Sequence, residues 1–264
     1  MKNRVMLVTI PKAGTYFVYE ILKGLGLAES YTHVRYDDKF IGLYHFRFVP
    51  KEIHRTSPEI VFYKMTFQDV LDRINPGEFA VGHLPPTPEV KGPLSDSFKI
   101  IFLVRDLKHC LVSHMRFMIQ STRIKESEHP WIRISDPKAK FINYLLNYAE
   151  PCGPLTQMKQ VACWEYVIRN PHPNMEIIKI RHEDLIHSDK SISRQALQSL
   201  CDFLQIGRKT DPESILNKAL GEKTVTKSEG KSSKYEDYWS PFAEQWFSKN
   251  ILIGDENINK LMGY

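Results

Sequence analysis

Short apolar runs alternate with amphipathic stretches along most of the chain, and the two patterns predict different elements. Residues 5–8 and 98–106 predict buried strands, because their apolar runs lack alternating polar positions. Each run precedes a helical pattern of apolar residues, which is carried first by Phe17, Val18, Ile21, Leu22 and Leu25 and then by Leu107, Leu111, Met115 and Met118. Further strands are predicted at 59–65, 78–85 and 175–184, and further helices at 69–74, 158–169 and 191–204.

The order of these elements predicts the fold class. Apolar strands separated by helices are typical of an α/β protein whose central, mainly parallel sheet is covered by helices on both faces. With 264 residues and 42% hydrophobic content, the chain is expected to form one domain over 1–264. Irregular structure is expected at 31–48, in a Pro-rich loop at 85–95, at 118–156 and in the polar tail at 223–239.

Composition narrows the range of ligands and compartments. The net charge of +5 is modest and dispersed, which favours an anionic ligand over nucleic acid. The four cysteines form no C-x-x-C pair, so they are interpreted as reduced thiols and not as disulfides or zinc ligands. No apolar run has the length of a membrane span or the flanks of a signal peptide. We therefore expect a cytoplasmic protein without a membrane or nucleic-acid partner.

A possible anion site follows the first predicted strand. The turn Pro-Lys-Ala-Gly-Thr joins that strand to a helix, an arrangement that binds phosphate groups at a helix N-terminus. Lys12 precedes Gly14, whereas the Walker motif of nucleoside triphosphate sites has its lysine after the glycine. The turn therefore predicts an anionic ligand of another kind.

Three polar residues are expected to meet at one edge of the sheet. Lys12, His83 and Arg105 each follow a predicted strand, and ligands of parallel sheets bind at the carboxyl ends of the strands. Ser113 lies eight residues after Arg105, about two helical turns into the next helix. An arginine fork with a hydroxyl group is suited to binding a phosphate monoester.

These segments resemble the motifs of sulfotransferases that use 3′-phosphoadenosine 5′-phosphosulfate (PAPS). "PKAGTYF" resembles their 5′-phosphosulfate loop, "VRDLKHCLVSH" their 3′-phosphate motif, and "GHLP" the segment with their catalytic histidine. "CWEYVIRNPHPNMEIIKIRHEDL" is similar to their W-E…Y-E-D-L stretch. The resemblance as a whole covers residues 4–242. It implies a P-loop-like α/β fold, PAPS as donor, 3′-phosphoadenosine 5′-phosphate (PAP) as product, and no metal.

The resemblance also implies site residues. His83 would be the general base, and Lys12 would stabilise charge on the leaving group. The expected donor-binding residues are Lys12, Ala13, Gly14, Thr15, Tyr16, Phe17, Arg105, Ser113, His182, Ser228, Gly230 and Lys231.

The chain departs from the family pattern at three places. Ala13 replaces a serine of the loop, and His182 stands where the family has a tyrosine near the adenine. In "SEGKSSKYEDYW", Ser228 and Glu229 occupy two positions where the family has cations. The missing charge is expected from Lys227, Lys231 or Lys234.

Two other functions remain open from the sequence. A P-loop nucleotide kinase would need a lysine after the glycine and a Ser/Thr for Mg²⁺. A nucleotide-binding module without activity is favoured by the eroded C-terminal motif and opposed by the retained Lys12 and His83. Phe17 fits both a core position and an adenine contact, and residues 182–184 fit both a metal site and a loop before a helix, of which the loop is preferred.

The acceptor is expected to be a small molecule with a hydroxyl or amine group. The chain looks most like bacterial, including cyanobacterial, sulfotransferases that modify secondary metabolites. The loops expected to form the acceptor pocket, 31–48, 85–95 and 118–156, mix aromatic and acidic residues. A polar or cationic natural product and a phenol or steroid both remain open, as do a monomer and a homodimer.

Overall fold

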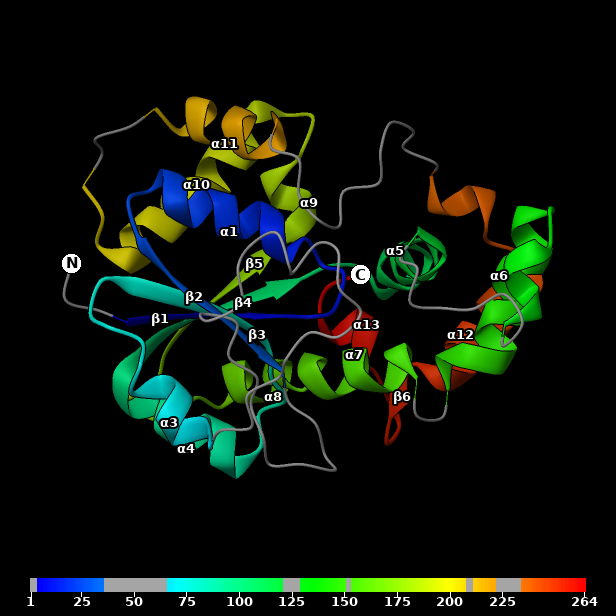
Figure 1. Cartoon of the computed structure of the whole chain (residues 1–264), viewed down its shortest axis with the longest axis horizontal. Coiled ribbons are helices and arrows are strands. Elements are labelled where there is room, and N and C mark those ends of the chain that lie inside the picture. Colours follow the sequence, from blue (N-terminus) through cyan, green and yellow to red (C-terminus); the bar gives the residue numbers. More distant parts are fainter. Residues whose placement is uncertain (1–3, 36–65, 121–128, 151–152, 208–210, 222–233) are drawn as a thin grey trace.

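One parallel sheet organises the molecule. The computed structural model describes residues 4–35, 66–120, 129–150, 153–207, 211–221 and 234–264. The sheet has the order β2-β3-β1-β4-β5 and every neighbouring pair in it is parallel (Figure 1). Its strands are β1 (Arg4–Thr9), β2 (Ala28–Arg35), β3 (Glu78–His83), β4 (Phe98–Val104) and β5 (Glu176–Arg181). The prediction of a mainly parallel central sheet is confirmed.

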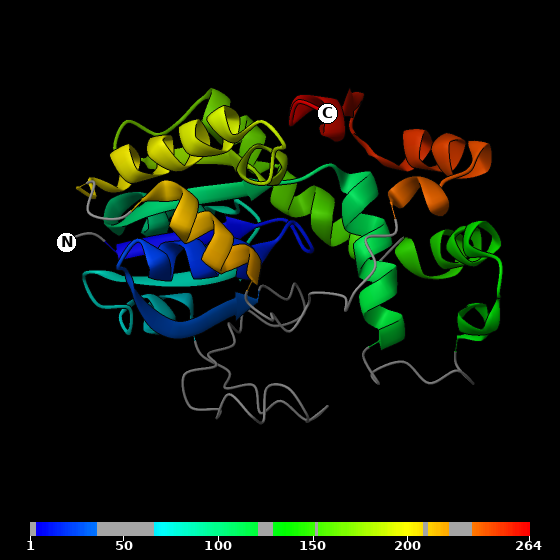
Figure 2. The same ribbon diagram turned by 90° about the horizontal axis from the view of Figure 1, so that it is seen from above.

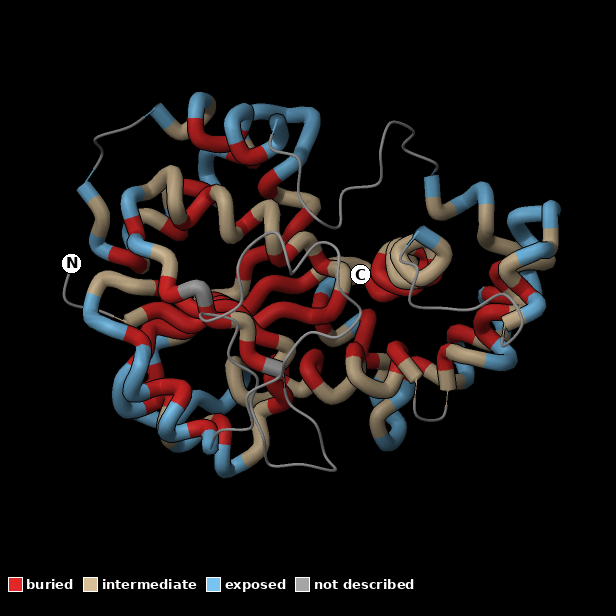
Figure 3. The backbone as a smooth tube through the Cα atoms, in the orientation of Figure 1, coloured by how far each residue is buried: buried red, intermediate tan, exposed pale blue. Residues whose placement is uncertain are grey.

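Helices cover both faces of this sheet. All of β4, and β1 from its second residue onward, are buried, as the red strands at the centre of Figure 3 show. Burial on both faces explains why neither strand alternates apolar and polar residues. One face is covered by α1 (Thr15–Gly24), α10 (Lys190–Leu204) and α11 (Pro212–Gly221), and the other by α3 (Phe67–Leu71), α4 (Pro88–Ser97) and α8 (Trp164–Arg169) (Figure 1).

A second group of helices lies beyond α5 (Leu107–Gln120), which stands between it and the sheet (Figure 2). Aromatic contacts hold this group together, because the rings of Trp131 and Tyr144 lie 5.4 Å apart and those of Phe141 and Trp239 also lie 5.4 Å apart. Its elements are η1 (Pro130–Arg133), α6 (Pro137–Tyr144), the π-helix η2 (Leu145–Ala149) and α12 (Pro241–Asn250). The remaining elements are α7 (Pro154–Ala162), α9 (His182–Leu185), η3 (Tyr235–Asp237), β6 (Leu252–Ile253), β7 (Glu256–Asn257) and α13 (Ile258–Leu261).

Several expectations of irregular structure were wrong. Residues 28–35 form the edge strand β2, whose buried positions Ser30, Thr32 and Val34 alternate but are partly polar. The expected loop at 85–95 is mostly α4, because Pro88 occupies the first helical turn, where no N–H bond is lost. The region 118–156 contains η1, α6 and η2, and residues 182–184 begin α9 in place of the expected loop.

Other expectations differ in detail or fall outside the structure. The helix predicted at 158–169 is divided into α7 and α8 at Cys163. The strand predicted at 59–65 and residues 36–48 lie outside the described residues. Within the described ranges, no helix combines the length and apolar character needed to cross a membrane.

Candidate functional site

The loop between β1 and α1 forms an unusual helix entry. Lys12 and Gly14 both have left-handed backbone conformations, with φ of 70° and 98°. The Ala13 N–H donates to the Ile10 carbonyl at 3.0 Å, which closes the turn. Gly14 is the N-cap of α1 and provides no side-chain cap, and the first N–H groups of a helix have no intrahelical acceptors. The loop therefore presents backbone donors to an anion.

Gly14 packs directly against His182 at the start of α9. A Cβ on Gly14 would overlap the His182 ring and lie 2.9 Å from its Nε2. The same ring lies 5.8 Å from the ring of Phe17, edge to face. Burial, with the charges of Arg105 and His109, lowers the His182 pKa to about 3, so this side chain is neutral at physiological pH.

The ammonium group of Lys12 is buried without a hydrogen-bond acceptor among the described residues. It lies 4.1 Å from the ring centroid of Phe117 on α5. Burial lowers the Lys12 pKa to about 8, and nearby Arg105 acts in the same direction. Because buried cations are normally paired, this orphaned donor indicates a place for an anionic ligand.

His83 ends β3 and is held by the neighbouring strand β1. Its Nδ1 lies 2.8 Å from the Thr9 carbonyl oxygen and 3.0 Å from the Thr9 Oγ1. A carbonyl oxygen can only accept, so Nδ1 carries the proton and Nε2 carries the lone pair of the neutral ring. The arrangement orients His83 as a proton acceptor at Nε2.

A chain of hydroxyl groups connects His83 to the loop. The Thr9 Oγ1 lies 2.8 Å from the Thr15 Oγ1, and both residues are buried. Either hydroxyl can be the donor in this pair, because a hydroxyl oxygen can accept two hydrogen bonds. Where Thr9 is the donor, the hydroxyl hydrogen of Thr15 is available for a ligand at the N-terminus of α1.

Two further polar residues lie near His83. The rings of His33 on β2 and His83 are 5.2 Å apart, and the Tyr16 hydroxyl is 3.5 Å from the His33 Nδ1. Tyr16 was expected at the loop, but His33 was missed because 31–48 was interpreted as irregular. No alternation of apolar residues marks β2 in the sequence, because its buried positions Ser30 and Thr32 are polar.

Arg105 follows β4 and contacts the loop. Its guanidinium donates to the Lys12 carbonyl at 3.3 Å, and its Nε lies 3.9 Å from the Glu183 Oε1. Ser113 lies on α5 between Cys110, whose Sγ is 3.9 Å from the Arg105 carbonyl, and Phe117. Residues three and four apart share a helix face, so Ser113 is on the side that faces the loop.

Supporting contacts fix the backbone after His83. Trp164 donates from Nε1 to the Leu84 carbonyl at 2.7 Å, and Glu165 pairs with Lys179 at 3.1 Å. Lys234 is exposed at the start of η3. The other expected residues of the C-terminal motif lie outside the described ranges: Lys227, Ser228, Glu229, Gly230 and Lys231.

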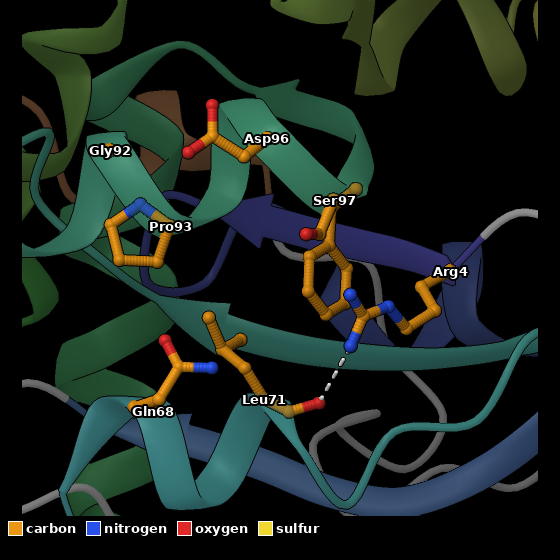
Figure 4. A pocket seen from close by; sticks show the side chains of 8 residues that line it. Arg4, Gln68, Leu71, Gly92, Pro93, Asp96 and Ser97 are labelled. Atoms are coloured by element: carbon orange, nitrogen blue, oxygen red, sulfur yellow. Dashed lines mark hydrogen bonds between the residues drawn. The ribbon is translucent and has the colours of Figure 1, made fainter.

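The described part of the chain contains no cluster of three His, Cys, Asp or Glu residues suited to a metal ion. A surface cavity of about 370 Å³ lies at the opposite, amino-terminal edge of the sheet (Figure 4). Its Arg4 donates to the Leu71 carbonyl at 3.3 Å and lies 4.6 Å above the Phe98 ring, so this cation is already engaged. Lys12, His83 and Arg105 instead lie at the carboxyl ends of β1, β3 and β4, at the other edge of the sheet.

Comparisons with known proteins found a matching family model and similar solved structures. The family model described as "Sulfotransferase domain" matches residues 2–247. The crystal structure of mouse sulfotransferase SULT7A1 complexed with PAP is similar, with a TM-score of 0.61 and 16% identity over 99% of this chain and 88% of that one. Retinol dehydratase in complex with androsterone and inactive cofactor PAP gives a TM-score of 0.46 and 17% identity over 96% of this chain and 82% of that one. No curated protein matches the sequence.

Proposed function

This chain belongs to the sulfotransferase family, and we propose that it transfers the sulfuryl group of PAPS to a hydroxyl or amine group of a small-molecule acceptor. The observation that carries this proposal is the buried ammonium of Lys12 at the entry to α1, which has no hydrogen-bond acceptor in the described part of the chain. A secondary metabolite is the proposed acceptor class. The mouse relative of similar fold binds PAP, the product that such a transfer would leave.

The residues at the sheet edge fit a donor with two anionic ends. Lys12 and Arg105 both have buried nitrogens without hydrogen-bond acceptors in the described structure, at Nζ and Nε. The 5′-phosphosulfate would bind the loop 12–16, with backbone N–H groups and the Thr15 hydroxyl as donors. Arg105 and Ser113 would bind the 3′-phosphate. These two nitrogens, Lys12 Nζ and Arg105 Nε, support one anionic subsite each.

The adenine would lie against Phe17 and His182. Their rings are 5.8 Å apart, and His182 is neutral because its pKa is lowered to about 3 by burial. A neutral ring adds no charge beside an uncharged base. His182, which stands where the family has a tyrosine, thus provides an uncharged aromatic ring for contact with the adenine.

The transfer would be an in-line displacement at sulfur. The acceptor oxygen forms a bond to sulfur while the bond from sulfur to the 5′-phosphate oxygen breaks. His83 takes the acceptor proton at Nε2, the nitrogen left basic by the contact of Nδ1 with Thr9. Lys12 stabilises the negative charge that develops on the leaving phosphate oxygen.

The acceptor would approach His83 from the side of β2. His33 and Tyr16 lie on this side and provide polar groups next to the base. This surrounding suits an acceptor with polar groups near the reacting hydroxyl or amine. It does not distinguish the two acceptor types.

Transfer of ³⁵S from labelled PAPS to a panel of hydroxyl and amine acceptors tests the proposal directly. We expect labelled product without added Mg²⁺. A parallel reaction with ³²P-labelled ATP and Mg²⁺ tests the nucleotide-kinase alternative. Thermal stabilisation by PAP without transfer to any acceptor would favour a nucleotide-binding module.

A further inference from the structure

The residues that follow the matched family domain fold back onto Arg105. The family model ends at residue 247, whereas α13 packs beside the carboxyl end of β4 and the start of α5 (Figure 1). The Leu107 N–H donates to the Asn259 Oδ1 at 3.0 Å, and the Asn259 Nδ2 donates to the Asp106 Oδ1 at 3.1 Å. This segment therefore contacts the two residues directly after Arg105.

Tyr264 extends these contacts to the ion pair of Arg105. Its hydroxyl donates to the Glu183 Oε2 at 2.5 Å, while the Glu183 Oε1 lies 3.9 Å from the Arg105 Nε. The guanidinium of Arg181 lies 4.6 Å from the Tyr264 ring centroid. Burial and the bond to Glu183 raise the Tyr264 pKa above its ordinary value, so the hydroxyl keeps its proton.

Glu183 is a potential competitor for Arg105. A carboxylate next to an anion site repels a bound phosphate and can itself form a close pair with the arginine. Here the carboxylate lies 3.9 Å from the Nε, beyond hydrogen-bond distance, while another guanidinium nitrogen donates to the Lys12 carbonyl. The short bond to Tyr264 holds Glu183 in this position.

We propose that Tyr264 is a positioning residue for the 3′-phosphate subsite: by holding Glu183 through its hydroxyl, it keeps Arg105 available for the phosphate. The inference rests on the proposed function, because it assumes that Arg105 binds the 3′-phosphate of PAP. Asn259 supports the same turn from α13. The segment after residue 247 thus contributes to donor recognition although the family model does not include it.

Titration calorimetry with PAP and adenosine 5′-monophosphate (AMP) tests this role, because the two ligands differ only in the 3′-phosphate. Tyr264→Phe is expected to raise the Kd for PAP roughly tenfold, the scale of one hydrogen bond to a charged group, and to leave the Kd for AMP unchanged. In a Glu183→Gln background the same substitution should have no effect on the ratio of the two Kd values, because no charged competitor remains.

Tyr166→Phe is the matched control. It removes the hydrogen bond between Tyr166 and Glu256, which also involves the segment after residue 247 but not Glu183. We expect it to leave the PAP-to-AMP ratio unchanged. Circular dichroism of each variant establishes that the fold is retained.

Two results would overturn the inference. The first is an equal loss of affinity for PAP and AMP in Tyr264→Phe. The second is an unchanged Tyr264→Phe effect on the ratio in the Glu183→Gln background, which would mean that the hydroxyl does not act through Glu183. If Tyr264→Phe does not fold, the single variant Glu183→Gln tests whether Glu183 competes with the phosphate. A tenfold loss of preference for PAP over AMP in that variant would contradict a competing role for Glu183. A wild-type protein that binds PAP no better than AMP would instead refute the proposed function.

Discussion

The Nδ1 of His83 lies 2.8 Å from the carbonyl oxygen of Thr9, the last residue of the adjacent strand β1. The parallel pairing of β1 and β3 therefore brings a histidine to the beginning of the anion-binding loop and fixes which of its nitrogens is basic. Thr9 contributes both its carbonyl and its hydroxyl to this contact.

The first prediction concerns the tautomer of His83. Long-range ¹H–¹⁵N spectra at a pH where the ring is neutral should show the proton on Nδ1. Thr9→Val keeps the carbonyl, so the tautomer should be unchanged while the unfolding free energy falls by about 1 kcal/mol for the lost hydroxyl bonds. A predominant Nε2–H form in the wild type would contradict the assigned role of Thr9.

The second prediction concerns the base itself. His83→Ala should lower kcat with a hydroxyl acceptor by roughly 10²-fold or more, with little change in PAP affinity. His172→Ala is the matched control, because His172 is exposed before the amino end of β5, away from the site. Near-normal turnover of His83→Ala would exclude His83 as the base. An amine acceptor that is already neutral should depend less on this residue.

The third prediction concerns Gly14. Gly14→Ala should be destabilising through both the left-handed backbone, which costs about 1–2 kcal/mol, and the overlap of its Cβ with His182. Gly26→Ala provides the control, because Gly26 also has a positive φ, of 90°. Apart from its chain neighbours, no atom of the described residues lies within 4 Å of the point where an added Cβ would lie. Denaturant unfolding should therefore show a larger loss for Gly14→Ala. Equal losses would mean that the loop moves away from His182 at no cost.

The fourth prediction concerns pH. Burial lowers the Lys12 pKa from 10.5 to about 8 in the ligand-free protein, and a bound anion raises it again. Below about pH 8 Lys12 is already protonated, so it adds no pH dependence there. Above that pH, PAP binding requires proton uptake, and the Kd should rise about tenfold per pH unit until the pKa of the bound state is reached.

Calorimetry in buffers of different ionisation enthalpy measures this proton uptake. Lys12→Met, which keeps an unbranched chain beside Phe117, should abolish it. A PAP affinity that is independent of pH between about 8 and 9.5 would show that Lys12 does not contact the ligand.

The sequence predicted the sheet well because its central strands are buried on both faces. Residues 5–8 of β1 and 100–104 of β4 are apolar without alternating polar positions, which is typical of strands buried on both faces. Both the parallel sheet and the sulfotransferase family are confirmed. The edge strand β2 was missed because it buries Ser30 and Thr32 through hydrogen bonds, which no hydrophobic pattern reports.

The sequence predicted which polar residues follow the strand ends, but not which side chains and backbone groups bond to them. The rule that ligands bind at strand ends placed Lys12, His83 and Arg105 together without any knowledge of distances. The bonds from His83 to Thr9 and from Tyr264 to Glu183 join residues 74 and 81 positions apart, and no local pattern encodes such pairs. The roles of these residues remain predictions.

Single-turnover sulfuryl transfer at saturating PAPS measures what Lys12 contributes to the chemical step. If Lys12 stabilises charge that grows on the leaving oxygen, its contribution is larger in the transition state than in the bound ground state. Rapid-quench measurements with enzyme in excess should then show a rate for Lys12→Met that is lower than the wild-type rate by roughly 10²-fold or more, with only a modest change in PAPS affinity. A Lys12→Met rate close to that of the wild type under these conditions would show that Lys12 does not stabilise the leaving group.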